Sequence, residues 1–243
     1  MPPDETTLAA PAVTAAHEFF SGVREAVPIV LGYLPIGFAY GIIAAKTGLS
    51  TLETVLMSVL VYAGASQFIA AGLIAAGAGF GTIVATTFLV NLRHLLMSAA
   101  LFPWLRGLRA PTRAGLAFEL TDETFALATT VFQKRAATAP FLAGLQLTAQ
   151  FTWVLSSLAG ALSGSLLTSV NRFGLDFALP AMFIALLVLQ LRSRVHLAAA
   201  GIAAACSLLF AQLIPGNWNV ILAAVIAATA GMFLEGGSKN RAD

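Results

Sequence analysis

Three polar side chains stand in the middle of a long apolar stretch of this sequence. Asn91, Arg93 and His94 fall within residues 82–102, a segment long enough to cross a bilayer as a helix. An arginine at mid-bilayer costs about 2.5–3.5 kcal/mol on insertion scales, so Arg93 needs a carboxylate, a carbonyl or water as its partner. On a helix, Asn91 and His94 share a face, whereas Arg93 points about 200° away from Asn91. We therefore expect these side chains to serve two different surfaces.

Two interpretations of Arg93 follow from its chemistry. A guanidinium group that lines a cavity matches the carboxylate of a small substrate, because its N–H groups bind both carboxylate oxygens. Alternatively, Arg93 forms a fixed ion pair with Asp122 or Glu123 that only holds the helices together. His94 has the same two interpretations, as a proton carrier or as a satisfied core residue.

A second polar position follows small residues in the segment Gly64-Ala-Ser-Gln-Phe68. Small residues let backbones approach closely, and exposed backbone beside them can bind a small ligand together with Ser66. The amide of Gln67 both donates and accepts hydrogen bonds, which suits an amino or carboxyl group. The alternative is that Gln67 bonds a neighbouring helix. Two GxxxG patterns, at residues 37–41 and 160–164, are typical of close helix packing.

Three carboxylates lie within five residues at Glu119, Asp122 and Glu123. Burial of one of them would raise its pKa and make it a proton site. We interpret Glu119 as part of a solvated acidic turn, and we keep Asp122 and Glu123, together with His94, as candidate proton carriers.

The sequence favours neither catalysis nor nucleic-acid binding. It has no nucleophile elbow and no phosphate-binding glycine loop. Its three scattered histidines and single Cys206 predict no metal site, no disulfide and no cofactor. The net charge of +2 is spread over short loops rather than clustered on a basic face. We expect a protein that is not an enzyme.

The elements that position these residues are predicted to be membrane-spanning helices. Charged residues make up 10% of the 243 residues against about 25% in soluble domains, and apolar residues make up 58%. We predict an all-α integral membrane protein with a polar extension (1–26), one polytopic membrane domain (27–235) and a tail (236–243). Its seven predicted spans are residues 27–45, 54–76, 82–102, 138–162, 175–191, 196–213 and 217–234.

Residues 114–132 are harder to assign, because they are apolar but contain the three carboxylates. If they form a partial or re-entrant helix and the N-terminus is outside, the positive-inside rule is satisfied. Ten basic residues then lie inside and two, Arg24 and Arg172, lie outside. If the segment crosses, the bias disappears. We therefore predict the N-terminus outside and the C-terminus inside.

A weak internal repeat relates residues 62–70 to residues 177–185, with four identities in nine positions. Both segments lie in the middle span of a three-span unit, residues 27–105 and 138–213. With residues 114–132 not crossing, these units have opposite orientations, as in the inverted repeats of many secondary transporters. Chance similarity between apolar segments is the alternative.

Four blocks of the sequence together resemble the AzlC family of permeases. They are Gly32 to Gly41, Tyr62 to Phe68, Asn91 to Leu96 and Leu120 to Leu127, and the resemblance covers about residues 19–235. It implies a bacterial inner-membrane exporter of branched-chain amino acids that works with a small hydrophobic membrane subunit of the AzlD or YgaH type. Residues 1–18 fall outside the resemblance.

The resulting prediction is a secondary exporter of valine, leucine or isoleucine, driven by proton antiport. Ser66, Gln67, Asn91 and Arg93 are the expected substrate-binding residues. Two alternatives stay open, which are a membrane subunit of an ATP-driven transporter and a structural subunit whose partner forms the pore.

Overall fold

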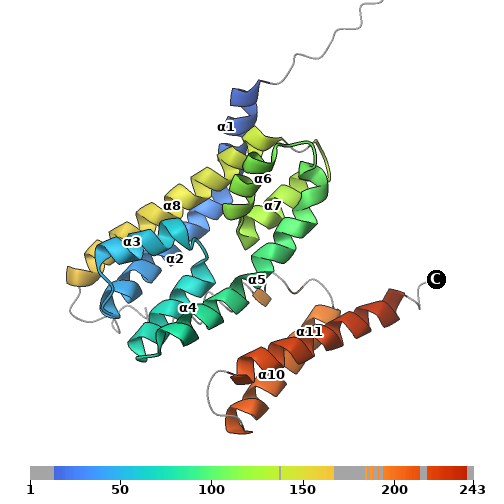
Figure 1. The fold of residues 1–243 in the computed structure, drawn as a ribbon. Helices are drawn as coiled ribbons and strands as arrows, with labels where there is room; N and C mark the ends of the chain where they lie inside the picture. The colour runs from blue at the N-terminus through green and yellow to red at the C-terminus, as the bar shows by residue number, and fades with distance from the viewer. Residues whose placement is uncertain are drawn as a thin grey trace, which may run out of the picture. The chain divides into compact units, whose positions relative to one another are not determined.

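The computed structural model describes residues 14–136, 138–166, 184, 187, 188, 191, 194–213 and 218–239, and this part of the chain is built of helices without strands (Figure 1). The chain divides into a first unit, residues 1–179, and a second unit, residues 180–243, and each is described by itself. The predicted span 175–191 and the second copy of the repeat, residues 177–185, lie almost entirely outside the described residues.

The first unit begins with two consecutive helices. Helix α1 (Ala15–Glu25) is capped by the Thr14 hydroxyl, which accepts a hydrogen bond from the His17 backbone N–H at 3.2 Å. Helix α2 (Val27–Lys46) has Pro28 in its first turn, where a missing N–H costs nothing, and it agrees with the predicted span 27–45.

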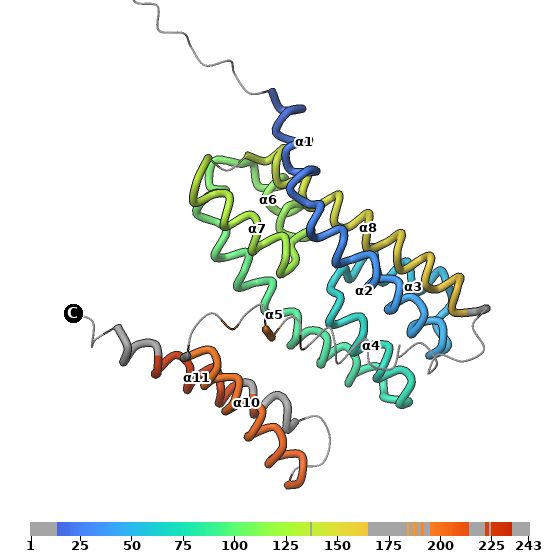
Figure 2. The backbone as a smooth tube through the Cα atoms, turned by 180° about the vertical axis from the view of Figure 1, so that it is seen from behind, coloured from blue at the N-terminus to red at the C-terminus, as the bar shows by residue number. Residues whose placement is uncertain are grey.

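Helix α8 (Ala139–Leu166) packs along both α1 and α2 and forms the most extensive helix pair of the unit (Figure 2). The helices touch backbone to backbone where the predicted GxxxG patterns meet. A Cβ atom built on Gly41 would lie 2.1 Å from the Ser157 carbonyl oxygen, and one built on Gly160 would lie 2.1 Å from the Phe38 carbonyl oxygen. The packing role expected of both patterns is confirmed.

The α8 helix runs parallel to α1 and α2. A Cβ atom on Gly22 would meet Phe141, one on Gly41 would meet Ser157, and one on Gly164 would meet Ile42, so contact positions rise together along both helices. The inverted-repeat hypothesis required residues 27–45 and 138–162 to cross in opposite directions. Parallel packing contradicts that orientation.

The predicted span 54–76 is wrong, because it is two short helices rather than one. Helix α3 (Thr51–Leu60) begins with a capping box between Ser50 and Glu53, and helix α4 (Gly64–Ala75) follows a break. Gln67 Nε2 donates to Ser58 Oγ at 3.1 Å, although nine positions along one helix would separate these residues by about 13.5 Å. The chain therefore folds back at residues 61–63, where Tyr62 has a φ of 41°.

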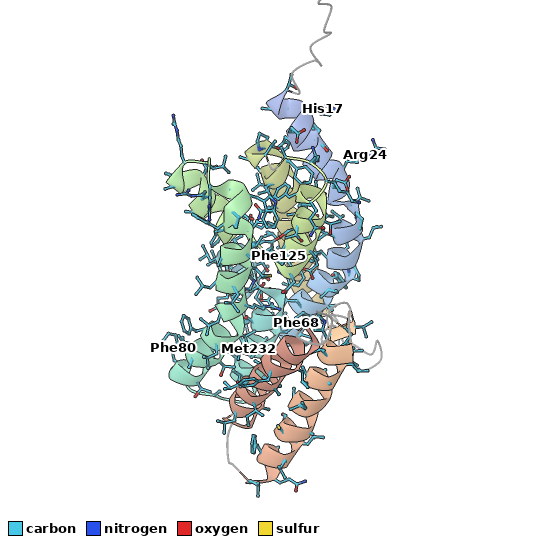
Figure 3. The ribbon with its side chains drawn as sticks, turned by 90° about the vertical axis from the view of Figure 1, so that its right-hand side faces the viewer. His17, Arg24, Phe68, Phe80, Phe125 and Met232 are labelled. Carbon is cyan, nitrogen blue, oxygen red and sulfur yellow. The ribbon has the colours of Figure 1, made fainter. Side chains whose placement is uncertain are left out.

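Helix α5 (Phe80–Leu105) is a single helix that contains the predicted span 82–102 and extends it at both ends. Figure 3 shows Phe80, at the start of α5, far from His17 of α1, at the other end of the first unit. Together with α2 and with Val195–Leu213 of the second unit, α5 is one of three described helices that are long and apolar enough to cross a membrane.

The acidic segment 114–132 forms a second hairpin of short helices. Helix α6 (Ala110–Phe118) and helix α7 (Asp122–Phe132) are separated by residues 119–121, and neither reaches the roughly 20 residues of a span. The tip of this hairpin lies beside the first half of α2, where the Tyr33 hydroxyl is 2.8 Å from Thr121 Oγ1. Its far end lies beside the start of α8, where the Phe132 and Phe141 rings are 6.0 Å apart.

The two hairpins enter the first unit from opposite ends. The α3–α4 hairpin starts where α2 ends, whereas α7 leads to residue 135, which bonds to α1 through Arg135 Nη1 and Glu18 Oε2 at 2.9 Å. Most basic side chains of the described residues 14–166 therefore gather at the α1 end. They are Arg24, Arg106, Arg109, Arg113, Lys134 and Arg135, while Lys46 lies at the other end.

In the described part of the second unit, helix α10 (Arg194–Leu213) packs against helix α11 (Trp218–Lys239). Gly231 lies at their contact, because a Cβ atom there would be 3.5 Å from the Ala199 Cβ atom. These helices correspond to the predicted spans 196–213 and 217–234.

Candidate functional site

The middle of α5 faces both hairpins, one through each of its polar residues. Asn91 Oδ1 accepts a hydrogen bond of 2.6 Å from Ser66 Oγ of α4. Arg93, two positions later, forms an ion pair of 2.6 Å between its Nη1 atom and Asp122 Oδ2 of α7. The expected division of these side chains between two surfaces is therefore what the structure has.

The ion pair of Arg93 leaves part of the guanidinium group unused. Its Nε atom is buried and has no hydrogen-bond partner among the described residues. The side chains of Arg93 and Asp122 are 28% and 24% exposed, so both are partly accessible. The buried Nε–H is a free donor that a second acceptor, such as a substrate carboxylate, would reach only if the side chains around it move.

Gln67 is completely buried and both ends of its amide are bonded within the first unit. Its Nε2 atom donates to Ser58 Oγ, and its Oε1 atom accepts a hydrogen bond of 3.0 Å from Trp153 Nε1 of α8. Ser58 Oγ is also 2.8 Å from Ser157 Oγ. This network holds the α3–α4 hairpin against α8, and a substrate would have to displace one of these bonds to reach Gln67.

His94 lies one turn after Asn91 on α5. Its Nδ1 atom is 3.2 Å from the Asn91 carbonyl oxygen. The remaining ring nitrogen, Nε2, is the atom left to exchange a proton or to bind a ligand.

A group of five residues, which we call the tip cluster, joins the two hairpins to α2. Its members are Tyr33, Tyr62, Glu119, Thr121 and Glu123. The Tyr33 hydroxyl donates to Glu123 Oε2 at 2.7 Å, and the Thr121 hydroxyl caps α7 by accepting from the Thr124 backbone N–H. Glu123 is thus held by a buried tyrosine, while Asp122, its neighbour, is held by Arg93.

Two atoms of the tip cluster are buried without a hydrogen-bond partner among the described residues. They are the Tyr62 hydroxyl oxygen and Glu119 Oε2. Tyr62 is 3% exposed, and the charges of Glu119 and Glu123 both act on its phenol group. Burial also raises the pKa of Glu119 to about 7. Glu119 is thus half-buried, with one carboxylate oxygen inside the protein, rather than fully solvated as predicted.

Tyr33, Tyr62 and Trp153 are residues of this region that sequence reasoning missed. Each resembles an ordinary apolar residue of a membrane helix, since tyrosine and tryptophan carry only a small polar group on a large apolar ring. The one available signal was the placement of Tyr62 directly before Ala-Gly, which is compatible with a helix break.

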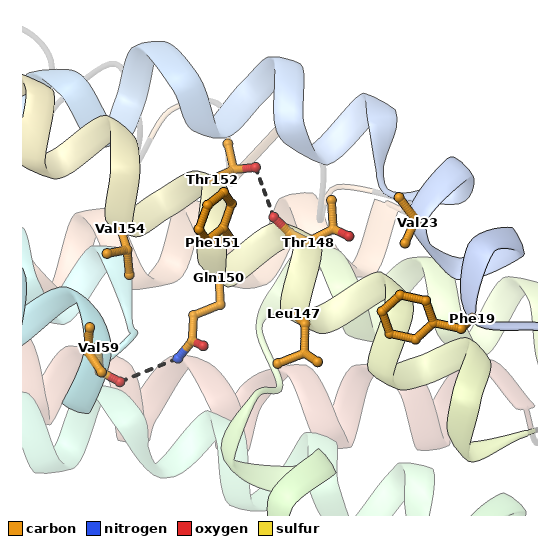
Figure 4. A pocket seen from close by; sticks show the side chains of 9 residues that line it. All are labelled: Phe19, Val23, Val59, Leu147, Thr148, Gln150, Phe151, Thr152 and Val154. Carbon is orange, nitrogen blue, oxygen red and sulfur yellow. Dashed lines mark hydrogen bonds between the residues drawn. The ribbon is translucent and has the colours of Figure 1, made fainter. Parts of the chain in front are cut away.

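Two cavities lined by described residues of the first unit lie beside this region. A groove of about 590 Å³ runs between α1, α3 and α8 and is lined mainly by apolar side chains such as Phe19, Val59 and Phe151 (Figure 4). A smaller cavity of about 240 Å³ lies between α5 and α6. Its lining includes Ser98, Arg113 and the leucines Leu101, Leu105, Leu116 and Leu120.

Two broken helices with half-buried carboxylates at one break, beside a continuous apolar helix that carries an arginine, are typical of one class of protein, the membrane transporters. The family model described as "AzlC protein" matches residues 28–167, and the chain belongs to this family.

Relatives from several organisms match along most of the chain. The inner membrane protein YgaZ of Escherichia coli K12 is 34% identical over 70% of this chain and 72% of its own length. An uncharacterized membrane protein of Archaeoglobus fulgidus is 36% identical over 90% of this chain and 94% of its own length. The branched-chain amino acid transport protein AzlC of Bacillus subtilis 168 is 28% identical over 86% of this chain and 82% of its own length. No solved structure matches the chain.

Proposed function

We propose that this chain exports branched-chain amino acids across the bacterial inner membrane by proton antiport, as the large subunit of a two-component permease. Membership of the AzlC family and the name of the Bacillus subtilis relative support amino acid transport across a membrane. The observation that carries the site assignment is the middle of α5, where Asn91 and Arg93 each contact one of two opposed hairpins.

In this proposal the substrate carboxylate binds Arg93, and Ser66 and Asn91 contribute polar contacts nearby. The cavity between α5 and α6 is mainly apolar and suits a branched aliphatic side chain. One of its lining residues, Leu120, is two positions before Asp122 in the sequence. Asp122, Glu123 and His94 are the proposed proton carriers. A carboxylate that binds Arg93 competes with Asp122, which links substrate binding to the charge state of the hairpin tip.

The small partner is proposed to be a hydrophobic membrane subunit of the AzlD or YgaH type. The groove between α1, α3 and α8 is apolar enough to face either lipid or another helix.

The fold supports a revised orientation, with the N-terminus inside. The expectation of an outside N-terminus assumed that residues 54–76 cross the membrane, and they form a hairpin instead. Within the described residues of the first unit outside α5, six basic residues then lie at the α1 end and one at the opposite end, and under the positive-inside rule this distribution favours a cytoplasmic α1 end. Single cysteines at residues 48 and 108, in a Cys206→Ser background, test this by labelling intact cells with an impermeant maleimide. Labelling at residue 108 only would contradict it.

Transport itself is tested with labelled valine in inverted membrane vesicles that contain this chain and its small partner. Accumulation driven by an imposed proton gradient, and its loss in Arg93→Gln at equal expression, would support proton-coupled export. Accumulation that needs ATP without a gradient would favour an ATP-driven transporter. Valine transport by the partner without this chain would favour a structural subunit.

A further inference from the structure

The tip cluster holds two unused acceptor atoms in a place where unused acceptors are costly. A buried polar atom without a hydrogen bond costs about 1–3 kcal/mol, so native proteins rarely keep one without a reason. Here two occur at the turns of the two hairpins, within electrostatic reach of each other: Tyr62 Oη between α3 and α4, and Glu119 Oε2 between α6 and α7.

The backbone at Tyr62 adds a second observation. Its φ of 41° lies in the left-handed region, which a residue without a side chain occupies more easily. A bulky residue in this conformation is strained, and such strain collects at ligand-binding sites. The strained backbone here carries a phenol group that is buried and directed to within electrostatic reach of Glu119 and Glu123.

The remaining polar groups of the cluster limit what can bind. The Tyr33 hydroxyl is occupied by Thr121 and by Glu123 Oε2, and Arg93 is paired with Asp122. The unused positions are therefore an anionic acceptor and a phenol oxygen, and the tip cluster itself contains no cationic side chain. A ligand that fits must bring positive charge and several N–H donors.

We propose that Glu119 and Tyr62 bind the primary ammonium group of the transported amino acid. This rests on the proposed function and deepens it, because Arg93 binds the opposite, carboxylate end of the same zwitterion. An ammonium group supplies three donors, which Glu119 Oε2, Tyr62 Oη and the nearby Glu123 carboxylate can accept.

Binding at Glu119 also couples the substrate to a proton. When Glu119 is protonated, its carboxylic acid has no charge to hold an ammonium group. The substrate binds after this proton leaves to solvent, and the carboxylate then accepts N–H bonds from the ammonium group. Because proton and substrate compete for one carboxylate, each binds only in the absence of the other, which is the requirement for antiport.

The test measures binding of L-valine and of isobutylammonium, a valine analogue without the carboxylate, to the purified complex in nanodiscs. We expect Glu119→Gln and Tyr62→Phe to weaken valine binding, by at least about tenfold for Glu119→Gln, since a charge-assisted hydrogen bond is lost. The matched control is Glu53→Gln, an exposed carboxylate of α3 whose capping bond glutamine can also make. A pH indicator dye in weak buffer should report a proton released on valine binding at pH 6.5 by the parent and not by Glu119→Gln.

Each result decides the proposal. Valine affinity and proton release that are unchanged in Glu119→Gln would overturn the ammonium site while leaving the proposed transport function in place. If the parent complex binds no valine, the proposed substrate is wrong, and isobutylammonium then decides the site. Binding of isobutylammonium that is lost in Glu119→Gln would sustain an ammonium site, and absence of binding would overturn it.

Discussion

The contact between α2 and α8 gives the sharpest prediction about stability. Gly41→Ala adds one Cβ atom, which would lie 2.1 Å from the Ser157 carbonyl oxygen and 2.6 Å from the Ala161 backbone nitrogen. Both neighbours are backbone atoms of α8, so no side-chain rotation relieves the overlap. Ordinary contact begins at 3.4 Å, and the helices must therefore separate by about 1.3 Å at this point.

The energetic cost follows from that separation. A gap of 0.5–1 Å already removes about a quarter to a half of the dispersion energy of facing atoms. Overpacking of this kind usually costs about 1–3 kcal/mol and occasionally more. Because α2 and α8 form the largest contact of the first unit, we expect about 2–4 kcal/mol, which corresponds to a fall of the melting temperature by roughly 5–15 °C.

The assay is thermal unfolding of the detergent-purified protein, followed by the loss of the monodisperse peak in fluorescence-detected gel filtration. The matched control is Gly32→Ala on the same helix, where a Cβ atom meets nothing within 4 Å. The control should be neutral or stabilising, since alanine is the better helix former by about 1 kcal/mol. If Gly41→Ala melts at the temperature of the control, the close approach of α2 and α8 is wrong.

Three further predictions concern the polar residues. If Arg93 binds the substrate, Arg93→Gln should abolish valine transport. The exchange Arg93→Asp with Asp122→Arg should then restore stability, because the ion pair is restored, but it should not restore transport. Recovery of both stability and transport would reduce the pair to a structural role. Gln67→Leu should lower the melting temperature by several degrees, because it leaves the buried Trp153 indole N–H without a hydrogen bond, which costs about 1–3 kcal/mol of stability. An unchanged melting temperature would contradict the hydrogen-bond network around Gln67. Valine affinity should rise as the pH increases from 5 to 8, because burial raises the pKa of Glu119 to about 7 and its carboxyl group is mostly protonated below that value. A flat profile in the parent would exclude Glu119 as the titrating group.

The sequence by itself determined the class of protein and the residues of interest. A low content of charged residues limits an all-helical chain to the membrane, and a charged residue in an apolar stretch needs a partner wherever the chain folds. For these reasons the residue types and spacing alone were enough to single out Asn91, Arg93 and Asp122. The GxxxG patterns at residues 37–41 and 160–164 also predicted close packing, because glycine spacing acts locally on one helix face.

Only the tertiary structure decided which apolar segments turn back and which cross. Hydropathy is the same for a helix of residues 54–76 and for a hairpin broken at Tyr62, since both contain the same side chains. The hairpin is stabilised by side-chain hydrogen bonds that a continuous helix could not make, such as those of Gln67 with Ser58 and with Trp153.

The burial of the tip cluster also depends on contacts between residues that are far apart in the sequence. From the sequence, Glu119 is interpreted as a solvated turn residue because it lies close to Asp122 and Glu123 in a segment flanked by basic residues, but one of its carboxylate oxygens is buried, within electrostatic reach of a buried tyrosine 57 positions earlier in the chain. Whether a carboxylate is hydrated or desolvated is set by what packs around it rather than by its neighbours in sequence. The sequence therefore supplied the chemical groups of the site, and the two opposed hairpins supplied their burial and their pairing.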